Sequence, residues 1–175
     1  DLMLNIPMNT NIYLTGYFQS SYYFDDNFDR IKEHFNLEIE EIAKNIFKKF
    51  NINNKKLISF HVRGSDYINN DYHLLLDESY YINCLKEIDL NDSYVILFTD
   101  DIKYASKFNN YIDINIIDII DLYIEDKYKY LRNNPELSFF LMSLCDNIIC
   151  ANSTYSLWAS YFSNAEKIFL PNKWF

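Results

Sequence analysis

The sequence predicts an α/β fold built on a Rossmann-like, mainly parallel sheet. From residue 55 onward, short runs of aliphatic and aromatic residues alternate with segments of helical periodicity, which is the pattern of strand–helix–strand units. The length of 175 residues and the 49% share of hydrophobic residues are enough for one packed domain plus a helical appendage. Parallel strands joined in this way place helices on both faces of the sheet.

Residues 1–54 are expected to be a strand and a helical segment that remain from, or link to, an N-terminal half. The strand and a turn are predicted before residue 25, where strand-forming residues are frequent. Asp25 and Asp26 are suited to capping the helix that follows. Apolar residues then recur at helical spacing as far as Phe50, with a break near Asn36. We expect this amphipathic segment to pack its apolar face inside the protein.

Residues 55–175 are expected to form the domain that contains the sheet. Aliphatic, β-branched and aromatic residues fit a buried, pleated surface, so short runs of them indicate strands. Pro135 suits the first turn of a helix. The predicted strands occupy residues 57–62, 94–99, 114–120, 148–151 and 168–170, and the predicted helices lie at residues 78–87, after 101, within 123–133, at 135–145 and after 152.

The formal net charge of -9 argues against a nucleic acid as the main partner, because binding phosphates requires a basic surface. The three cysteines show no metal-type spacing, which indicates reduced thiols in a reducing compartment. No apolar run approaches the roughly 20 residues that span a bilayer, and the first residues lack the pattern of a signal peptide. We therefore expect a protein that is cytoplasmic or peripheral to a membrane.

The first polar cluster follows the strand predicted at residues 57–62. His61, Arg63 and Asp66 come at or just past its carboxyl end, which is the edge of a parallel sheet where ligands bind. Arginine is suited to bidentate phosphate binding, and Gly64 lets the backbone approach a ligand closely. A nucleoside diphosphate would satisfy these groups, and an ordinary solvated loop is the plainer alternative.

The second cluster, Phe98-Thr-Asp-Asp101, lies at the carboxyl end of the strand predicted at residues 94–99, and Asp100 and Asp101 directly follow this strand. A carboxylate in this place can accept hydrogen bonds from a guanine edge, hold magnesium or cap the next helix. Paired acids at a strand end also occur in magnesium-dependent phosphotransfer domains. All of these roles stay open for the pair.

The third cluster lies directly after the strand predicted at residues 148–151, at the start of a helix. Hydroxyl groups and free backbone N–H groups at a helix N-terminus form an anion site, which the helix dipole strengthens by roughly 0.3–1 kcal/mol. A helix cap with nothing bound is the alternative. Since all three clusters follow strands, we expect them to converge on one pocket. The residues of the third cluster are Asn152, Ser153, Thr154, Tyr155 and Ser156.

The three clusters together resemble the motifs of the α-1,2-fucosyltransferases of glycosyltransferase family 11. The family's first motif, His-x-Arg-Arg-Gly-Asp-Tyr, stands here as His61-Val-Arg-Gly-Ser-Asp-Tyr67, and a strand ending in Ser-Asp-Asp stands as Leu97-Phe-Thr-Asp-Asp101. The third motif, Leu-Met-Ser-x-Cys followed by Asn-Ser-Ser-Phe-Ser-Trp-Trp, stands as Leu141-Met-Ser-Leu-Cys145 and Asn152-Ser-Thr-Tyr-Ser-Leu-Trp158. Two departures from these motifs matter: Gly64 replaces the family's second arginine, and Leu157 replaces its first tryptophan.

The resemblance implies that the chain is the C-terminal, nucleotide-binding half of a GT-B glycosyltransferase. It implies GDP-β-L-fucose as the donor, with no metal and no other cofactor. The expected reaction is inverting transfer of L-fucose to a hydroxyl of a galactoside or another glycan acceptor, in an α-1,2 linkage. Peripheral association with a membrane is a further expectation.

The same resemblance implies roles for the residues that hold the donor. Arg63, with the helix start at residues 153–156, would stabilise the charge on the departing GDP. His61 and one acid of the Asp100 and Asp101 pair would orient the guanosine.

The acceptor hydroxyl needs a carboxylate base within hydrogen-bond reach. Asp66 is the first candidate, followed by Asp71 and Glu78. A structural role, in which Asp66 braces Arg63, is the alternative.

Two other functions stay open at this point. The loss of the second arginine at Gly64 suits a non-catalytic or degenerate GDP-sugar or glycan-binding module. A magnesium-dependent phosphotransfer domain could be built on Asp100 and Asp101, but it would leave Arg63 and the helix start after residue 152 unexplained.

Overall fold

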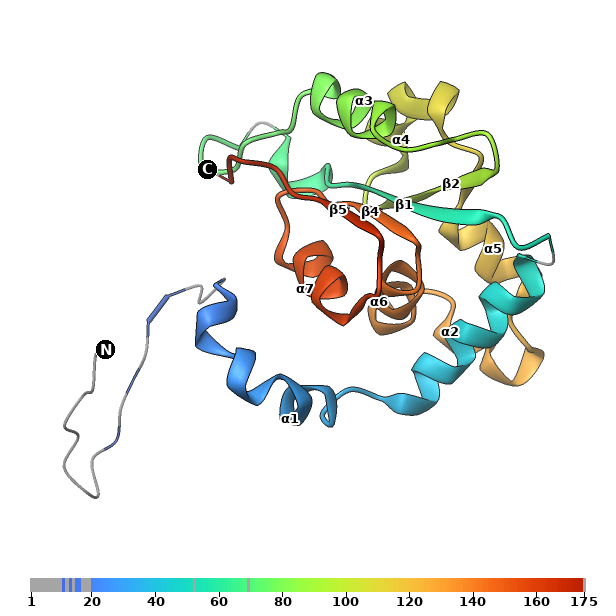
Figure 1. Cartoon of the computed structure of the whole chain (residues 1–175), viewed down its shortest axis with the longest axis horizontal. Coiled ribbons are helices and arrows are strands. Elements are labelled where there is room, and N and C mark those ends of the chain that lie inside the picture. Colours follow the sequence, from blue (N-terminus) through green and yellow to red (C-terminus); the bar gives the residue numbers. More distant parts are fainter. Residues whose placement is uncertain are drawn as a thin grey trace. The chain divides into compact units, whose positions relative to one another are not determined.

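The computed structural model in Figure 1 describes residues 11, 13, 15, 16, 20–51, 53–68 and 70–174. The strand expected before residue 25 lies mostly outside these described residues. The chain divides into two compact units, residues 1–35 and 36–175. The domain boundary expected after residue 54 stays a prediction.

The first unit contains two short 3-10 turns, Ser21–Tyr23 and Asp25–Asn27, and the helix α1 (Phe28–Lys32). The expectation that Asp25 or Asp26 caps α1 is wrong, because both lie inside a 3-10 turn and Asn27 precedes the helix.

The second unit begins with α2 (Leu37–Phe50). The predicted break near Asn36 is confirmed, and it has a local cause. The side chain of Asn36 accepts a hydrogen bond from the N–H of Glu38 at 3.0 Å, so this residue caps α2. Ile39, Ile42 and Ile46 are buried on one face of the helix, as the helical spacing of the apolar residues predicts.

Among the residues described in the second unit, five strands form one sheet, and each pairing between them is parallel. The prediction of an α/β fold with a parallel sheet is therefore confirmed. The central strand β1 pairs with β2 on one side and β4 on the other, and the order is β3-β2-β1-β4-β5. The strands are β1 (Lys56–Val62), β2 (Ser93–Thr99), β3 (Ile114–Asn115), β4 (Asn147–Ile149) and β5 (Lys167–Phe169).

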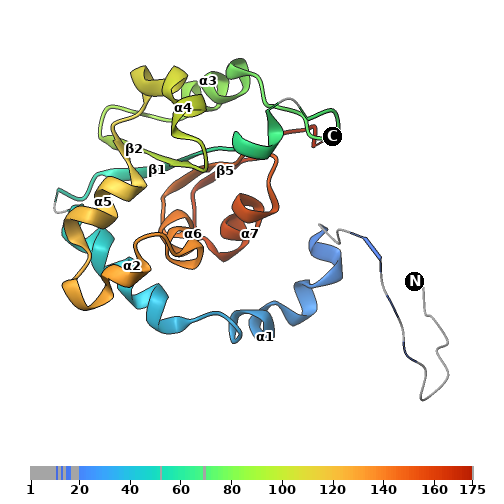
Figure 2. The same ribbon diagram turned by 180° about the vertical axis from the view of Figure 1, so that it is seen from behind.

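Helices cover both faces of this sheet, as Figure 1 and the reverse view in Figure 2 show. The helices α3 (Glu78–Lys86) and α4 (Ile102–Ala105) lie on one face. On the other face, α6 (Pro135–Ser143) packs against both α2 and α7 (Thr154–Phe162).

The run at residues 114–120 differs from its prediction as a strand. Only Ile114 and Asn115 pair with β2, and the helix α5 (Ile116–Tyr123) begins directly after them. The side chain of Asn115 accepts a hydrogen bond from the N–H of Ile117 at 2.8 Å and so caps α5. Ile116, Ile119 and Ile120 are buried at helical spacing, so this isoleucine-rich run satisfies a helix as well as a strand.

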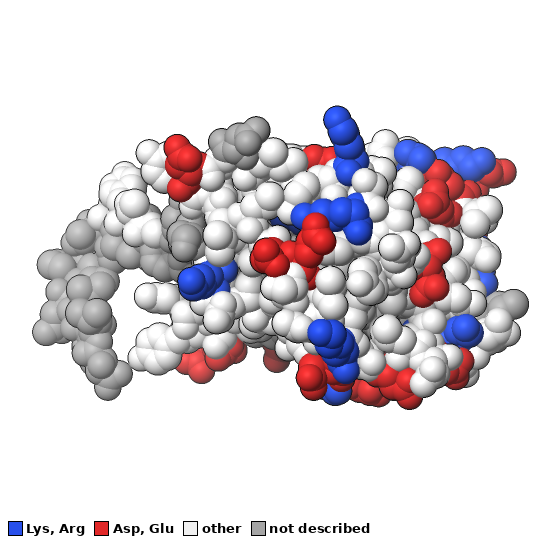
Figure 3. Space-filling view, turned by 90° about the horizontal axis from the view of Figure 1, so that it is seen from above, with Lys and Arg blue, Asp and Glu red and all other residues white. Residues whose placement is uncertain are grey.

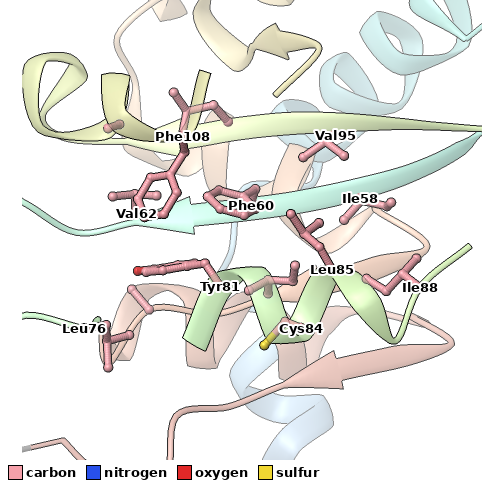
Figure 4. Close-up of a cluster of buried hydrophobic side chains, with 14 residues drawn as sticks. Ile58, Phe60, Val62, Leu76, Tyr81, Cys84, Leu85, Ile88, Val95 and Phe108 are labelled. Carbon is pink, nitrogen blue, oxygen red and sulfur yellow. The ribbon is translucent and has the colours of Figure 1, made fainter. Parts of the chain in front are cut away.

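The core between β1 and α3 is built around three aromatic rings (Figure 4). The ring centre of Phe60 lies 5.0 Å from that of Tyr81 and 5.2 Å from that of Phe108. These separations are typical of favourable aromatic pairs. Val62, the last residue of β1, is also fully buried in this cluster. The packing therefore fixes β1 up to the point where the polar residues begin.

Candidate functional site

The first two polar clusters meet at the carboxyl ends of β1 and β2. The strands pair in a register that places His61 beside Phe98 and Val62 beside Thr99. Arg63 and Asp100 each follow the last pair directly. This register brings residues 37 positions apart in the sequence into contact.

The guanidinium group of Arg63 is held between two carboxylates. Its Nη2 lies 2.7 Å from Oδ1 of Asp66, and its Nη1 lies 2.9 Å from Oδ2 of Asp100. The ring of Tyr67 also lies near the guanidinium, with 5.6 Å between Cζ and the ring centre. The side chain of Arg63 is 32% exposed, so it is oriented by its neighbours and still reachable by a ligand.

The carboxylate of Asp100 is engaged through both of its oxygens. Oδ2 pairs with Arg63, while Oδ1 accepts a hydrogen bond from the backbone N–H of Gly64 at 2.9 Å. The hydroxyl of Ser65 donates to the Asp100 carbonyl at 3.2 Å. Asp100 therefore fastens the turn after β1 to the end of β2.

Asp101 serves the next helix. Its Oδ1 accepts a hydrogen bond from the N–H of Tyr104 at 2.9 Å, which is a helix cap on α4. Of the roles left open for the two acids, capping therefore applies to Asp101. The assignment of one of the acids to the guanosine stays a prediction.

Gly64 lies where a side chain would not fit. A β-carbon at this position would meet the β-carbon of Asp101 at 2.7 Å and that of Tyr104 at 3.2 Å. An arginine in this place, as in the family motif, would require the backbone to move. The departure from the motif at Gly64 thus has a local steric reason.

His61 is buried near the end of β1, with 5% of its surface exposed. Burial lowers its pKa to about 4; the Asp100 carboxylate opposes this shift, and Arg63 adds to it. The imidazole is therefore neutral near pH 7. Within the described part of the chain, its buried Nδ1 has no hydrogen-bond partner, and such buried polar atoms are uncommon in folded proteins.

Asn152, in the third cluster, connects three segments of the chain. Its Nδ2 donates to the carbonyl of Leu74 at 2.7 Å and to that of Trp174 at 3.2 Å. The backbone carbonyl of Asn152 accepts a hydrogen bond from the hydroxyl of Tyr67 at 2.9 Å. The side chain is thus committed to the loop after β1 and to the C-terminal segment.

The other members of the third cluster form the start of α7. Ser153 accepts from the N–H of Tyr155 at 3.3 Å and caps the helix, while the buried Ser156 hydroxyl donates to backbone carbonyls. Thr154 is exposed. Tyr155 donates to the carbonyl of Pro135 at 2.6 Å, and burial raises the pKa of its hydroxyl.

A cavity of about 380 Å³ collects part of the predicted site. Four of the predicted residues line it: His61, Arg63, Asp100 and Tyr155. Asp66, Asp101, Asn152, Ser153, Thr154 and Ser156 are absent from its lining. The predicted convergence at one pocket therefore holds for one residue or more from each of the three clusters.

Sequence reasoning missed the other wall of this cavity. It comes from the start of α5 and from the start of α6, and it is largely apolar. The start of α5 was missed because residues 114–120 were predicted to be a strand. The start of α6 was predicted from Pro135, but not as part of the site. The missed lining residues are Ile116, Ile117, Asn133, Pro135 and Ser138, whereas Phe98 and Thr99 belong to the second predicted cluster.

The candidates for the base lie in different places. The side chain of Asp66 is 57% exposed and pairs with Arg63, as the bracing role predicts. Asp71 lines a separate open hollow of about 580 Å³, formed by residues 67 and 70–75. The carboxylate of Glu78 lies 3.6 Å from Nζ of Lys107.

Charges of both signs lie close together on the face seen from above in Figure 3. Among the described residues, no group of three or more His, Cys, Asp or Glu side chains is arranged to hold a metal ion. In the same part of the chain, none of the helices has the length and apolar character needed to cross a membrane. The expectations about metals, nucleic acids and cellular location stay predictions.

Similarity to known proteins covers almost the whole chain. The sequence model of a family described as Glycosyl transferase family 11 matches residues 1–174. The O-antigen biosynthesis glycosyltransferase WbnK of Escherichia coli is 30% identical over 180 residues, which cover 93% of this chain and 55% of that protein. An alpha-1,2-colitosyltransferase of Escherichia coli is 28% identical over 182 residues, covering 98% of this chain and 59% of that protein.

Among solved structures, the fucosyltransferase NodZ from Bradyrhizobium matches with a TM-score of 0.44 and 13% sequence identity. That match covers 72% of this chain and 42% of the NodZ chain. The chain described here spans between 55% and 59% of the length of the two Escherichia coli relatives.

Proposed function

The chain belongs to glycosyltransferase family 11, and we propose that it binds a nucleotide sugar and takes part in transferring the sugar to a glycan. The observation that carries this proposal is the cavity at the ends of β1 and β2, where Arg63 and the buried, neutral His61 meet an apolar wall. A cavity of this kind suits a ligand with a flat apolar ring and an anionic group.

GDP-β-L-fucose is the donor that we propose. Its pyrophosphate would bind Arg63, because guanidinium binds phosphate in a bidentate manner. Its guanine would lie against Phe98 and Ile116, beside the neutral imidazole of His61. The chain would thus act as the C-terminal, donor-binding half of a GT-B enzyme.

The reaction that we propose is a direct displacement with inversion at the anomeric carbon. The acceptor oxygen forms a bond to this carbon as the bond to the β-phosphate oxygen breaks, and GDP leaves with the electron pair. The hydroxyl proton passes to a carboxylate base, for which Asp66 is our first choice. Arg63 stabilises the charge that develops on the leaving phosphate, so the mechanism uses no metal.

The acceptor is a galactoside or another glycan, with α-1,2 as the proposed linkage. Peripheral association with a membrane is also part of this proposal. One relative is an alpha-1,2-colitosyltransferase, so nucleotide-linked colitose is the second candidate donor.

Calorimetric titration with GDP, GDP-fucose, UDP and UDP-galactose tests the donor class. We expect binding only with the guanosine compounds, and Arg63→Ala should weaken it by at least tenfold, since it removes charge-assisted hydrogen bonds. Asp92→Asn is the matched control, because Asp92 is exposed and precedes β2 at the opposite edge of the sheet. GDP affinity that is unchanged in Arg63→Ala would contradict the phosphate role. Binding of GDP-fucose without transfer of fucose to any tested acceptor would favour the non-catalytic module.

A further inference from the structure

We propose that the two carboxylates that hold Arg63 have opposite effects on the donor. Asp100 positions the guanidinium for the pyrophosphate, whereas Asp66 competes with the pyrophosphate and is displaced by it. This inference rests on the proposed function, because it concerns the group that would bind the donor.

Asp100 is built into the turn that presents Arg63. One oxygen receives the Gly64 N–H and the other receives Arg63, both at 2.9 Å, and the side chain is only 24% exposed. If this carboxylate left Arg63, the backbone N–H of Gly64 would lose its partner as well, and an unsatisfied backbone donor is costly. Asp100 therefore stays in place when a ligand arrives.

Asp66 is held much less firmly. Its carboxylate contacts Nη2 of Arg63 and is 57% exposed, so water can replace that contact at little cost. Its backbone is fixed separately, since Nδ2 of Asn70 donates to the Asp66 carbonyl at 2.9 Å. The side chain can swing away while the turn keeps its shape.

The geometry of Arg63 allows this exchange without a change in its orientation. Asp100 occupies Nη1, and Asp66 occupies Nη2. A phosphate oxygen can therefore take the Nη2 side while Asp100 keeps the other. The Tyr67 ring, 5.6 Å from Cζ, supports the guanidinium throughout. The released Asp66 carboxylate then lies beside the bound donor, where the proposed base is needed, and only when the donor is present.

Replacing these two neighbouring carboxylates should therefore change the affinity for GDP in opposite directions. Calorimetric titration with GDP at fixed ionic strength would compare the wild type with Asp66→Asn, Asp100→Asn and the control Asp92→Asn. We expect Asp66→Asn to bind GDP about two- to fivefold more tightly, since it removes a weak competing ion pair. Asp100→Asn should bind about tenfold more weakly, although it too removes a negative charge, because Arg63 loses a charged partner. Asp92→Asn should match the wild type.

The outcomes separate this inference from the proposed function. If the wild type binds no GDP, or binds it as well when Arg63 is replaced by alanine, the proposed function fails and the inference fails with it. If GDP binding depends on Arg63 but Asp100→Asn binds as tightly as the wild type, only the positioning role of Asp100 is wrong. Weaker binding in Asp66→Asn would overturn the competition.

A measurement on the wild type covers the case in which Asp100→Asn does not fold. The carboxyl carbons of Asp66 and Asp100 can be followed by NMR during titration with GDP. We expect the Asp66 signal to move as its partner changes from guanidinium to water, and the Asp100 signal to move much less. A large shift at Asp100 with none at Asp66 would contradict the proposal.

Discussion

Gly64 and Asp101 pack so closely that a β-carbon on Gly64 would lie 2.7 Å from the β-carbon of Asp101. The N–H of Gly64 also donates to Asp100. The residue without a side chain is thus the point at which the turn after β1 touches the end of β2.

Gly64→Ala is expected to lower the free energy of unfolding by about 1–3 kcal/mol, the usual cost of forcing an extra carbon into a packed site. GDP affinity should fall with it, because the hydrogen bond to Asp100 is displaced. Urea unfolding and calorimetry would measure the two effects. Asp92→Asn is a suitable control, since Asp92 is exposed and precedes β2 at the opposite edge of the sheet. Wild-type stability in Gly64→Ala would show that the turn can relax.

The buried His61 predicts a dependence of stability on pH. Its pKa is about 4 in the folded chain and about 6.5 when unfolded, so the unfolded chain takes up this proton first as pH falls. Stability should therefore be full above pH 6.5 and decrease toward pH 4, by about 3 kcal/mol in all. The difference between wild type and His61→Gln in urea unfolding at several pH values isolates this contribution. A pH-independent difference would contradict it.

Asn152→Ala should destabilise the chain by about 2 kcal/mol, because the carbonyls of Leu74 and Trp174 lose their hydrogen bonds. Hydrogen exchange should become faster in residues 70–76 and near the C-terminus, with little change in β1. Asn164→Ala, at an exposed position, provides the control. Equal exchange in both variants would argue against the connecting role of Asn152.

Transfer of fucose is expected to continue in the presence of EDTA, since Arg63 supplies positive charge at the phosphate in the proposed mechanism. The measurement is the initial rate of fucose transfer before and after chelation, made with a protein sample that is active in this assay. Complete loss of the rate, restored by magnesium, would require a different account of the leaving group.

Displacement of Asp66 by the donor predicts an ordered reaction in which the donor binds before the acceptor. An acceptor analogue that lacks the attacked hydroxyl should then inhibit uncompetitively with respect to the donor. Initial-rate kinetics at several analogue concentrations would measure this pattern. Noncompetitive inhibition would indicate binding in either order.

The sheet could be predicted well because its strands are short and strongly apolar. β1 and β2 occur within one residue of their predicted positions. The error at residues 114–120 arose because isoleucine suits both a buried strand and a buried helical face, and the cap formed by Asn115 decides the outcome. The hydrophobic periodicity of a sequence contains no information about such a cap.

The site could be predicted as a location and not as a set of contacts. The carboxyl ends of parallel strands share one edge, so the meeting of Arg63 with Asp100 followed from topology. Which atoms pair depends on the strand register, which neither motif contains. The apolar wall from α5 and α6 was missed because its residues follow from the packing of helices against the sheet, and single-sequence patterns carry little information about such packing.

β1 has a neighbouring strand on each side, and this has a consequence for engineering. The ladder with β4 ends at Phe60, and the ladder with β2 continues to Val62. A substitution that shifts the end of β1 must disturb this pairing with β2, so His61 and Arg63 are poor positions at which to alter donor preference. Ile117 and Ser138 line the same cavity from two helices that pack outside the sheet. A library that varies these two positions should change which sugar nucleotide is accepted while the anchoring of its phosphates is preserved.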